Sequence, residues 1–188
     1  IAVQGVINGA LERGINPHVI VSSIEHPAVL EPVKKLLKAG KIEVSFINPN
    51  EVGLINVESV KKEIKDNTVL VCIMHANNEI GTIQPVGKIG SLLKEYRKNK
   101  KLDRREPLLA YPYLFVDASQ SALYEDVSPE RLGADIVIVD GIKMYGPRGA
   151  GILAVKHGVG IAPITFGGGQ EKGLRPGTEN VISAVGLA

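Results

Sequence analysis

The stretch that decides the fold is Thr68-Val69-Leu70-Val71-Cys72-Ile73-Met74, followed directly by His75-Ala76-Asn77-Asn78-Glu79. Its first part is an unbroken apolar run with the length of a buried strand, and its second part is polar. Strands that are apolar along their whole length, rather than at every second residue, are typical of parallel sheets covered on both faces. This stretch therefore predicts a central strand that carries polar side chains at its carboxyl end.

The same alternation extends outward along the chain in both directions. Further strands are predicted at 18–23, 42–46, 113–116, 134–139 and 151–155, and helices at 28–38, 57–65, 86–98 and from 179 to the end. The first residues also have helical spacing, and the polar segment 100–111, which contains proline, is expected to be a loop. Strands and helices in alternation predict an α/β domain with a mainly parallel sheet between two layers of helices.

Composition narrows the class of partner. The chain has 188 residues, of which 44% are apolar, enough for one domain with a large core. The chain has 22 Lys and Arg against 20 Asp and Glu, so its net charge is only +2. We therefore expect neither nucleic acid nor a membrane as a partner. The basic run 97–101 is expected to be a solvated helix end. The single cysteine, Cys72, cannot form an internal disulfide, which favours a reducing location such as the cytoplasm.

Polar residues follow four of the predicted strands at the point where each strand ends. They are Glu25-His26, 75–79, Asp117-Ala118-Ser119-Gln120 and Asp140-Gly141-Ile142-Lys143. Ligands of open parallel sheets bind at the carboxyl ends of the strands. We therefore expect these groups to form one pocket for a polar, anionic ligand.

Asp117 and Lys143 are of the types that pyridoxal phosphate (PLP) requires. A lysine can attach the cofactor covalently, and a carboxylate can pair with the pyridine nitrogen and keep it protonated. On their spacing alone, a helix cap at Asp117 and a surface charge at Lys143 are the better interpretation. A wider pattern is needed to favour the cofactor.

Six ordered segments supply that pattern, and they resemble the large domain of cysteine desulfurases, class-V members of the aspartate-aminotransferase fold. They are Ser23-Ile24-Glu25-His26-Pro27-Ala28-Val29, Met74-His75-Ala76-Asn77-Asn78-Glu79-Ile80-Gly81, Val116-Asp117-Ala118-Ser119-Gln120-Ser121, Lys143-Met144-Tyr145-Gly146-Pro147-Arg148-Gly149, Gly167-Gly168-Gly169-Gln170-Glu171 and Arg175-Pro176-Gly177-Thr178-Glu179-Asn180. The resemblance implies PLP as the cofactor and no metal. No G-x-G-x-x-G motif opens a helix after a strand, which disfavours a dinucleotide.

The resemblance also implies a role for individual residues. Lys143 would bind PLP covalently and act in catalysis, and Asp117 would pair with the pyridine nitrogen. His26 would stack on the ring and move protons, although it could also be only a helix-start residue.

Three further residues are implied as cofactor contacts. Asn78 and Gln120 would contact the side of the ring that carries the phenolic oxygen, with a simple turn role as the alternative for Asn78. Thr178 would reach the PLP phosphate of the partner subunit in a homodimer. Its alternative is the capping hydroxyl of the last helix.

The match departs from the family next to the lysine. The family usually has a histidine immediately before the lysine and a small residue two places before that histidine, whereas this chain has Ile142 and Asp140. Ile142 removes a donor to the cofactor phosphate. At ~4 Å and an effective dielectric of ~20, a carboxylate would repel a phosphate charge by about 4 kcal/mol. We therefore expect Asp140 to turn away, take up a proton or pair with a cation.

The resemblance implies a function for the parent protein: conversion of L-cysteine to L-alanine, with the sulfur passed to an acceptor protein for iron–sulfur clusters or thiolation. Residues 1–188 would be the large PLP-binding domain, incomplete at both ends, without the small C-terminal domain that carries the sulfur-accepting cysteine. Cys72, inside an apolar strand, is expected to be a core residue instead. The chain alone is therefore expected to be inactive and to bind PLP weakly or not at all.

Other functions remain open at this stage. A selenocysteine lyase, which would act on L-selenocysteine, is the nearest alternative, and another class-V aminotransferase is a further one. A degenerate scaffold or dimerisation domain is supported by Asp140 and Ile142. That last interpretation is opposed by the combination of Lys143, Asp117, His26 and Gln120, because a chain that no longer binds PLP has no need of it.

Overall fold

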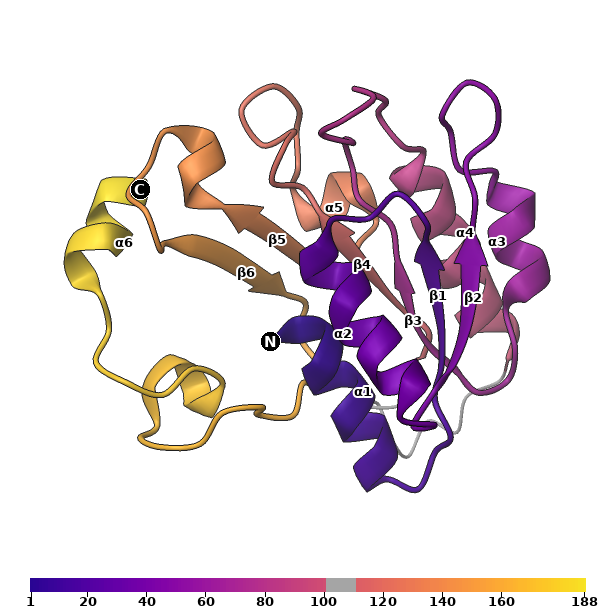
Figure 1. Ribbon diagram of the computed structural model, residues 1–188, viewed down its shortest axis with the longest axis horizontal. Coiled ribbons are helices and arrows are strands. Elements are labelled where there is room, and N and C mark those ends of the chain that lie inside the picture. Colours follow the sequence, from indigo (N-terminus) through magenta and orange to yellow (C-terminus); the bar gives the residue numbers. More distant parts are fainter. Residues whose placement is uncertain (101–110) are drawn as a thin grey trace.

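The structure is a computed structural model that describes residues 1–100 and 111–188. Its centre is a six-stranded sheet in the order β2-β1-β3-β4-β5-β6, in which β1 to β5 run parallel and β6 runs antiparallel to β5 (Figure 1). The strands are β1 (His18–Ser22), β2 (Glu43–Ile47), β3 (Thr68–Cys72), β4 (Tyr113–Asp117), β5 (Ile136–Asp140) and β6 (Gly151–Val155). The helices are α1 (Ala2–Glu12), α2 (Pro27–Lys38), α3 (Val57–Glu63), α4 (Val86–Asn99), α5 (Pro129–Leu132) and α6 (Val181–Leu187), with short 3-10 helices η2 (Gly141–Met144) and η3 (Gln170–Gly173).

The predicted α/β architecture is confirmed. Each predicted strand and helix is present, and its ends shift by a residue or two, as helix and strand boundaries commonly do. Only β6 departs from the parallel arrangement. The segment 100–111 falls almost entirely outside the described residues, so its expected loop structure stays a prediction.

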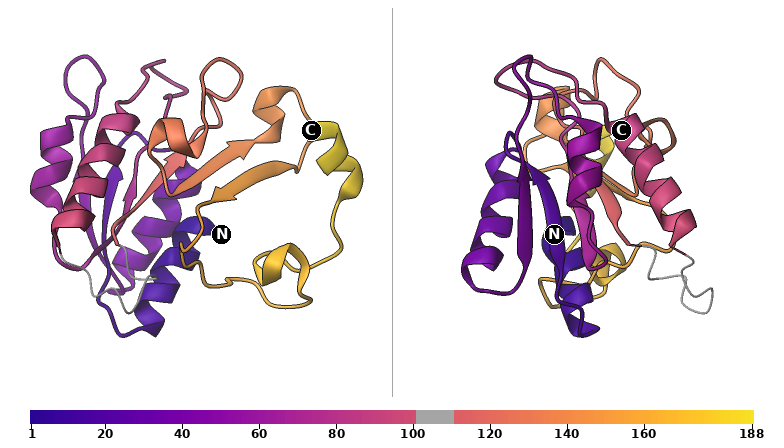
Figure 2. Two further views of the ribbon diagram at one scale, coloured as in Figure 1. Left: turned by 180° about the vertical axis from the view of Figure 1, so that it is seen from behind. Right: turned by 90° about the vertical axis from the view of Figure 1, so that its right-hand side faces the viewer.

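Helices cover both faces of the sheet, as the views in Figure 2 show. From Leu70 to Ile73, successive residues alternate between two apolar clusters. Leu70 and Cys72 pack in the cluster that contains α1 and α2, and Val71 and Ile73 pack in the cluster that contains α3 and α4. Each fully buried aliphatic side chain stabilises the fold by about 1.5–3 kcal/mol, so both faces require apolar residues. Cys72 is fully buried, which confirms that it is a core residue.

The basic run at the end of α4 is only partly a solvated helix end. Arg97 Nη1 lies 2.6 Å from Asp135 Oδ2, and both side chains are mostly buried. Asp135 also accepts a hydrogen bond from the Leu114 amide at 2.9 Å. The expectation of a solvated run is therefore wrong for Arg97, which ties α4 to the amino end of β5. Lys98 and Asn99 are exposed and follow the expectation, whereas Lys100 is partly buried and pairs with Asp66. Lys101 lies outside the described residues.

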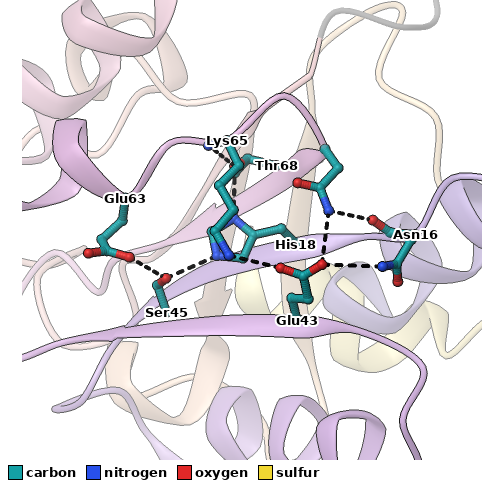
Figure 3. A network of polar contacts seen from close by, with 8 residues as sticks. Asn16, His18, Glu43, Ser45, Glu63, Lys65 and Thr68 are labelled. Atoms are coloured by element: carbon teal, nitrogen blue, oxygen red, sulfur yellow. Dashed lines mark hydrogen bonds and ion pairs between the residues drawn. The ribbon is translucent and has the colours of Figure 1, made fainter.

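A buried histidine at the amino end of β1 connects this strand to β2 and β3, away from the edge where the polar strand ends lie (Figure 3). His18 Nδ1 lies 2.8 Å from the Thr68 hydroxyl, and its Nε2 lies 3.0 Å from the Ser45 hydroxyl. Ser45 donates its only hydroxyl proton to Glu63, so it accepts from Nε2–H, and Nδ1 of the neutral ring accepts the Thr68 hydroxyl proton. Burial lowers the pKa of His18, and the ring is a neutral structural link.

After β6 the chain leaves the sheet as an extended arm, drawn in yellow in Figure 1. The arm first crosses α1, where the Ala162 amide donates to the Gly5 carbonyl at 3.0 Å. It ends with α6, whose Leu187 lies against Gly141. Large apolar side chains on the arm are exposed, namely Phe166, Val181, Ile182 and Val185. Within the described part of the chain, no helix has both the length and the apolar character needed to cross a membrane.

Candidate active site

Glu25 and Asn77 tie the carboxyl ends of β1 and β3 together. Glu25, in the turn between β1 and α2, accepts the Met74 amide at 2.5 Å through Oε1. Asn77 donates from its side-chain amide to the Ile24 carbonyl at 2.9 Å. The side-chain oxygen of Asn77 also accepts the Glu79 amide at 2.8 Å, which fixes the turn that carries the second asparagine. These bonds fix the relative positions of the first two polar strand ends.

The ends of β3, β4 and β5 are linked in the same way. The His75 amide donates to the Asp117 carbonyl at 2.8 Å, and the Asp140 amide donates to the Ser119 hydroxyl at 3.0 Å. The four polar strand ends therefore meet at one edge of the sheet, as the parallel topology predicts. The loops that leave this edge form the upper rim of Figure 1.

Asp117 is the last residue of β4, and only 8% of it is exposed. Its Oδ1 accepts the Ser119 amide at 3.0 Å and caps the turn that follows β4. Residues 119–124 form turns rather than a helix, so the simpler alternative of a helix cap is wrong. Among the described residues, neither a donor to Oδ2 nor a cation that pairs with this carboxylate is found. The cap therefore leaves one oxygen of a nearly buried carboxylate available to a cationic N–H group.

Lys143 lies in η2, directly after β5, and is exposed. Gly141 begins this turn at a point where a Cβ atom would lie 2.7 Å from the Ala150 carbonyl, so a side chain does not fit there. Asp140 Oδ1 accepts the Ile142 amide at 3.2 Å and so caps the turn. The Asp140 carboxylate is thus hydrogen-bonded within its own turn. Ile142, by contrast, is an apolar residue that is 40% exposed.

His26 is exposed and begins α2 as its N-cap, with Nδ1 accepting the Ala28 amide at 3.1 Å. The helix-start role is therefore present. It does not conflict with a cofactor role, because the cap uses Nδ1 and leaves the ring face and Nε2 without a hydrogen bond to the described residues.

The three other predicted cofactor contacts differ in position. Gln120 is half-buried three residues after Asp117, and Asn78 is exposed at the end of the β3 segment. Thr178 is exposed on the arm and forms no hydrogen bond or ion pair with the strand ends among residues 1–100 and 111–188. The cap of α6 is Asn180, whose Oδ1 accepts the Ser183 amide at 3.1 Å, so Thr178 does not cap that helix.

Sequence reasoning assigned no role to Glu25, although it follows a buried strand and precedes His26. Glu25 is only 4% exposed, and its Oε1 also accepts the Ser22 hydroxyl at 2.6 Å. Its Oε2 has no hydrogen-bond partner among the described residues. Burial, with a smaller contribution from the negative charge of Asp117, raises the pKa of Glu25 to about 7. The only signal for this in the sequence is an acidic residue placed directly at a strand end.

His75 has a structural role at this edge. Ser121 Oγ donates to the Ala118 carbonyl, so it accepts from His75 Nδ1 at 2.9 Å. Burial lowers the pKa of His75, so its ring is neutral. Because that ring is hydrogen-bonded to the turn after β4, we do not count His75 among the cofactor-binding residues.

The sequence profile of the aminotransferase class-V family matches residues 2–188. The chain belongs to the class-V aminotransferase family. A protein of Archaeoglobus fulgidus named cysteine desulfurase IscS 1 is 43% identical over 170 residues, which are 90% of this chain and 40% of that protein. The cysteine desulfurase IscS of Clostridium botulinum is 38% identical over 186 residues, 99% of this chain and 43% of that protein. The predicted family resemblance is confirmed.

Solved structures of the class-V family agree with this fold. A structure described as SspA in complex with cysteine has a TM-score of 0.85 and 35% identity, and the match covers 98% of this chain and 49% of that one. A NifS-like protein has the same TM-score and 37% identity, covering 98% and 47%. This chain thus spans less than half the length of the relatives that it matches.

Class-V enzymes of this kind are PLP-dependent, and the described residues fit that cofactor at its ring end. The open oxygen of the nearly buried Asp117 suits a protonated pyridine nitrogen, which would supply the cation that this carboxylate lacks. Lys143 is exposed and forms no ion pair within the described residues, so its amine is available. The phosphate end fits less well, because Ile142 offers no side-chain donor.

Proposed function

We propose that this chain is the PLP-binding core of a cysteine desulfurase, which removes sulfur from L-cysteine and yields L-alanine. The observation that carries the proposal is Asp117: a nearly buried carboxylate with one open oxygen, on the strand end next to the turn that carries Lys143. The hydrogen bond from Asp140 to Ser119 joins these two strand ends. The names of similar proteins support the choice of cysteine over other amino-acid substrates.

When bound, PLP supplies an electron sink for the substrate carbon that loses its proton. Asp117 would keep the proton on the pyridine nitrogen. His26 would cover the ring face, and Gln120 and Asn78 would hold its phenolic oxygen. Lys143 would attach the cofactor and then move the substrate's Cα proton.

The sulfur must leave through a thiol other than Cys72. Burial raises the pKa of Cys72 well above its ordinary value, so it is neither ionised nor accessible as a nucleophile. We propose that a cysteine outside these 188 residues takes the sulfur and passes it to an acceptor protein for iron–sulfur clusters. We further propose a cytoplasmic homodimer in which Thr178 reaches the partner subunit's PLP phosphate.

The test is spectroscopic. Increasing PLP is added to the purified full-length parent protein, the absorbance of the lysine-bound cofactor is followed, and L-cysteine is then added. We expect a saturable band that L-cysteine changes, that Lys143→Ala abolishes and that Lys94→Ala, at an exposed position on α4, leaves intact. A band retained in Lys143→Ala would exclude Lys143 as the attachment site. L-selenocysteine in parallel distinguishes a selenocysteine lyase.

The exposed Ile142 favours one alternative, a scaffold that has lost PLP. Ile142→His restores the family's residue and adds a donor beside the lysine. If the chain is a PLP enzyme with a weakened phosphate site, this variant should bind PLP about 10- to 100-fold more tightly, the effect of one added charge-assisted hydrogen bond of about 1.5–3 kcal/mol. No measurable binding by either protein would favour the scaffold. The sequence-based expectation that the chain alone binds PLP weakly stays a prediction.

A further inference from the structure

Ser119 forms two hydrogen bonds that connect the ends of β4 and β5. Its amide donates to Asp117 Oδ1 at 3.0 Å, and its hydroxyl accepts the Asp140 amide at 3.0 Å. Asp140 Oδ1 in turn accepts the Ile142 amide at 3.2 Å, and Ile142 directly precedes Lys143. A continuous path of hydrogen bonds therefore runs from the Asp117 carboxylate to the turn that carries the lysine.

The Ser119 hydroxyl takes a place in the β4–β5 ladder that a backbone carbonyl would otherwise fill. The two strands are parallel, and the Ala118 amide donates to the Ile138 carbonyl at 2.9 Å. In a regular parallel ladder, the next bond would run from the Asp140 amide back to the Ala118 carbonyl. That carbonyl instead accepts three donors of the turn after β4, each at 3.1 Å. The Ser119 side chain therefore continues the ladder past the end of β4.

The turn that carries Lys143 is held on its other side by β6. Its Gly141 amide donates to the Ala150 carbonyl at 3.0 Å, which fixes the turn against the start of that strand. Within residues 1–100 and 111–188, the bond from Asp140 to Ser119 is the one hydrogen bond that joins this turn to the end of β4 or to the turn after it. The direction of the turn relative to β4 thus depends on a single side-chain hydroxyl.

We propose that Ser119 is a positioning residue that sets the placement of Lys143 relative to Asp117. This role rests on the proposed PLP function, in which one planar cofactor is attached to the lysine and pairs with the carboxylate through its ring nitrogen. Because the ring is rigid, both groups must already lie at the matching separation when it binds. The hydroxyl can be removed without loss of the cap on Asp117, since that cap uses the Ser119 amide.

The loss of the hydroxyl should weaken PLP binding by a limited factor. Removal of one neutral hydrogen bond lowers the population of the conformation that it holds by about 2- to 10-fold. Only that conformation accepts the ring at both ends. The dissociation constant of PLP should therefore rise by about the same factor.

A matched pair of variants, Ser119→Thr and Ser119→Val, tests this in the full-length parent protein. Their side chains have the same shape and differ in the hydroxyl group. Ser119→Thr should bind PLP like the wild type, and Ser119→Val should have a dissociation constant about 2- to 10-fold higher. Ser91→Ala removes an exposed hydroxyl that also forms one hydrogen bond, on α4, and should leave PLP binding unchanged.

A double-mutant cycle separates positioning from a general stabilising effect. Asp117→Asn keeps the oxygen that accepts the Ser119 amide but removes the charge that pairs with the ring nitrogen. In that background the placement of Lys143 relative to position 117 no longer matters, so Ser119→Val should change the PLP dissociation constant by less than about twofold. If the full factor persists with Asp117→Asn, Ser119 does not act through the placement of these two groups.

Amide hydrogen exchange tests the link without the cofactor. The Asp140 amide should exchange about 2- to 10-fold faster in Ser119→Val than in Ser119→Thr. Equal exchange rates, or equal PLP dissociation constants for the two variants, would overturn the positioning role and leave the proposed function standing. If the exchange rates differ but the wild type takes up no PLP, the link between the strand ends stands and the proposed function falls, and the positioning role falls with it. Should Ser119→Val not fold, Ser119→Ala against the wild type gives the same comparison.

Discussion

Replacing Glu25 by glutamine should change how the stability of the fold depends on pH. The ordinary pKa of this carboxyl group is 4.5, and burial raises it to about 7 in the folded chain. The folded state therefore holds the proton more tightly than the unfolded state. The resulting stabilisation is fully present below pH 4.5 and is lost as the pH rises through 7.

The size of the effect follows from the two pKa values. Each unit of difference corresponds to about 1.4 kcal/mol, so the whole effect is about 3 kcal/mol, and most of it falls between pH 5 and pH 8. Little of this is lost to solvent screening, because Glu25 is only 4% exposed. Glutamine keeps the acceptor for the Ser22 and Met74 bonds and cannot ionise.

Urea unfolding of both proteins at pH 5, 6, 7 and 8 measures this dependence. The free energy of unfolding of the wild type, minus that of Glu25→Gln, should fall by on the order of 2–3 kcal/mol from pH 5 to pH 8. Exposed carboxyl groups titrate alike in both proteins and cancel. A difference that stays constant over this range would refute the assignment of a raised pKa to Glu25.

Two predictions concern the frame that holds the site. Arg97→Ala should lower the free energy of unfolding, measured by urea titration, by about 3–5 kcal/mol, because it leaves the buried Asp135 charge unpaired. As a control, Lys34→Ala removes an exposed ion pair and should lower it by less than about 1 kcal/mol. Similar losses for the two variants would contradict the buried pair. Gly90→Ala should lower the free energy of unfolding by about 1–3 kcal/mol, because the added Cβ would lie 2.6 Å from a backbone carbonyl at the end of α5. Gly87→Ala places its Cβ 3.6 Å from the nearest atom, so it should leave the melting temperature unchanged or raise it slightly. Equal melting temperatures for these two would show that α4 and α5 are not in such close contact.

The fold was predictable because each strand and helix has its own pattern of apolar residues in the sequence, and that pattern recurs along the chain. Each buried strand is an apolar run in the sequence, and 68–74 alone indicates a sheet with two covered faces. Arg97 was misjudged for the opposite reason. Its partner, Asp135, lies 38 residues away, and only the packed sheet brings the two together.

The positions of site residues were predictable where they are set by the ends of strands. The positions of Asp117 and Lys143 depend on where β4 and β5 stop, and the sequence indicates that. The state of Glu25 depends on its burial and on the distant amide of Met74, neither of which leaves a local pattern. Thr178 lies on an arm whose expected contact is with a second subunit, so that role stays a prediction.

The most direct test of the central claim is chemical trapping of PLP on the protein. Borohydride reduction makes a lysine–PLP linkage permanent, and peptide mass spectrometry then locates it. The account predicts that the label concentrates on Lys143 at PLP levels that leave exposed lysines such as Lys94 unlabelled, and that Asp117→Ala weakens this preference. Equal labelling of Lys143 and Lys94 would contradict the assignment of this strand-end edge as a PLP site.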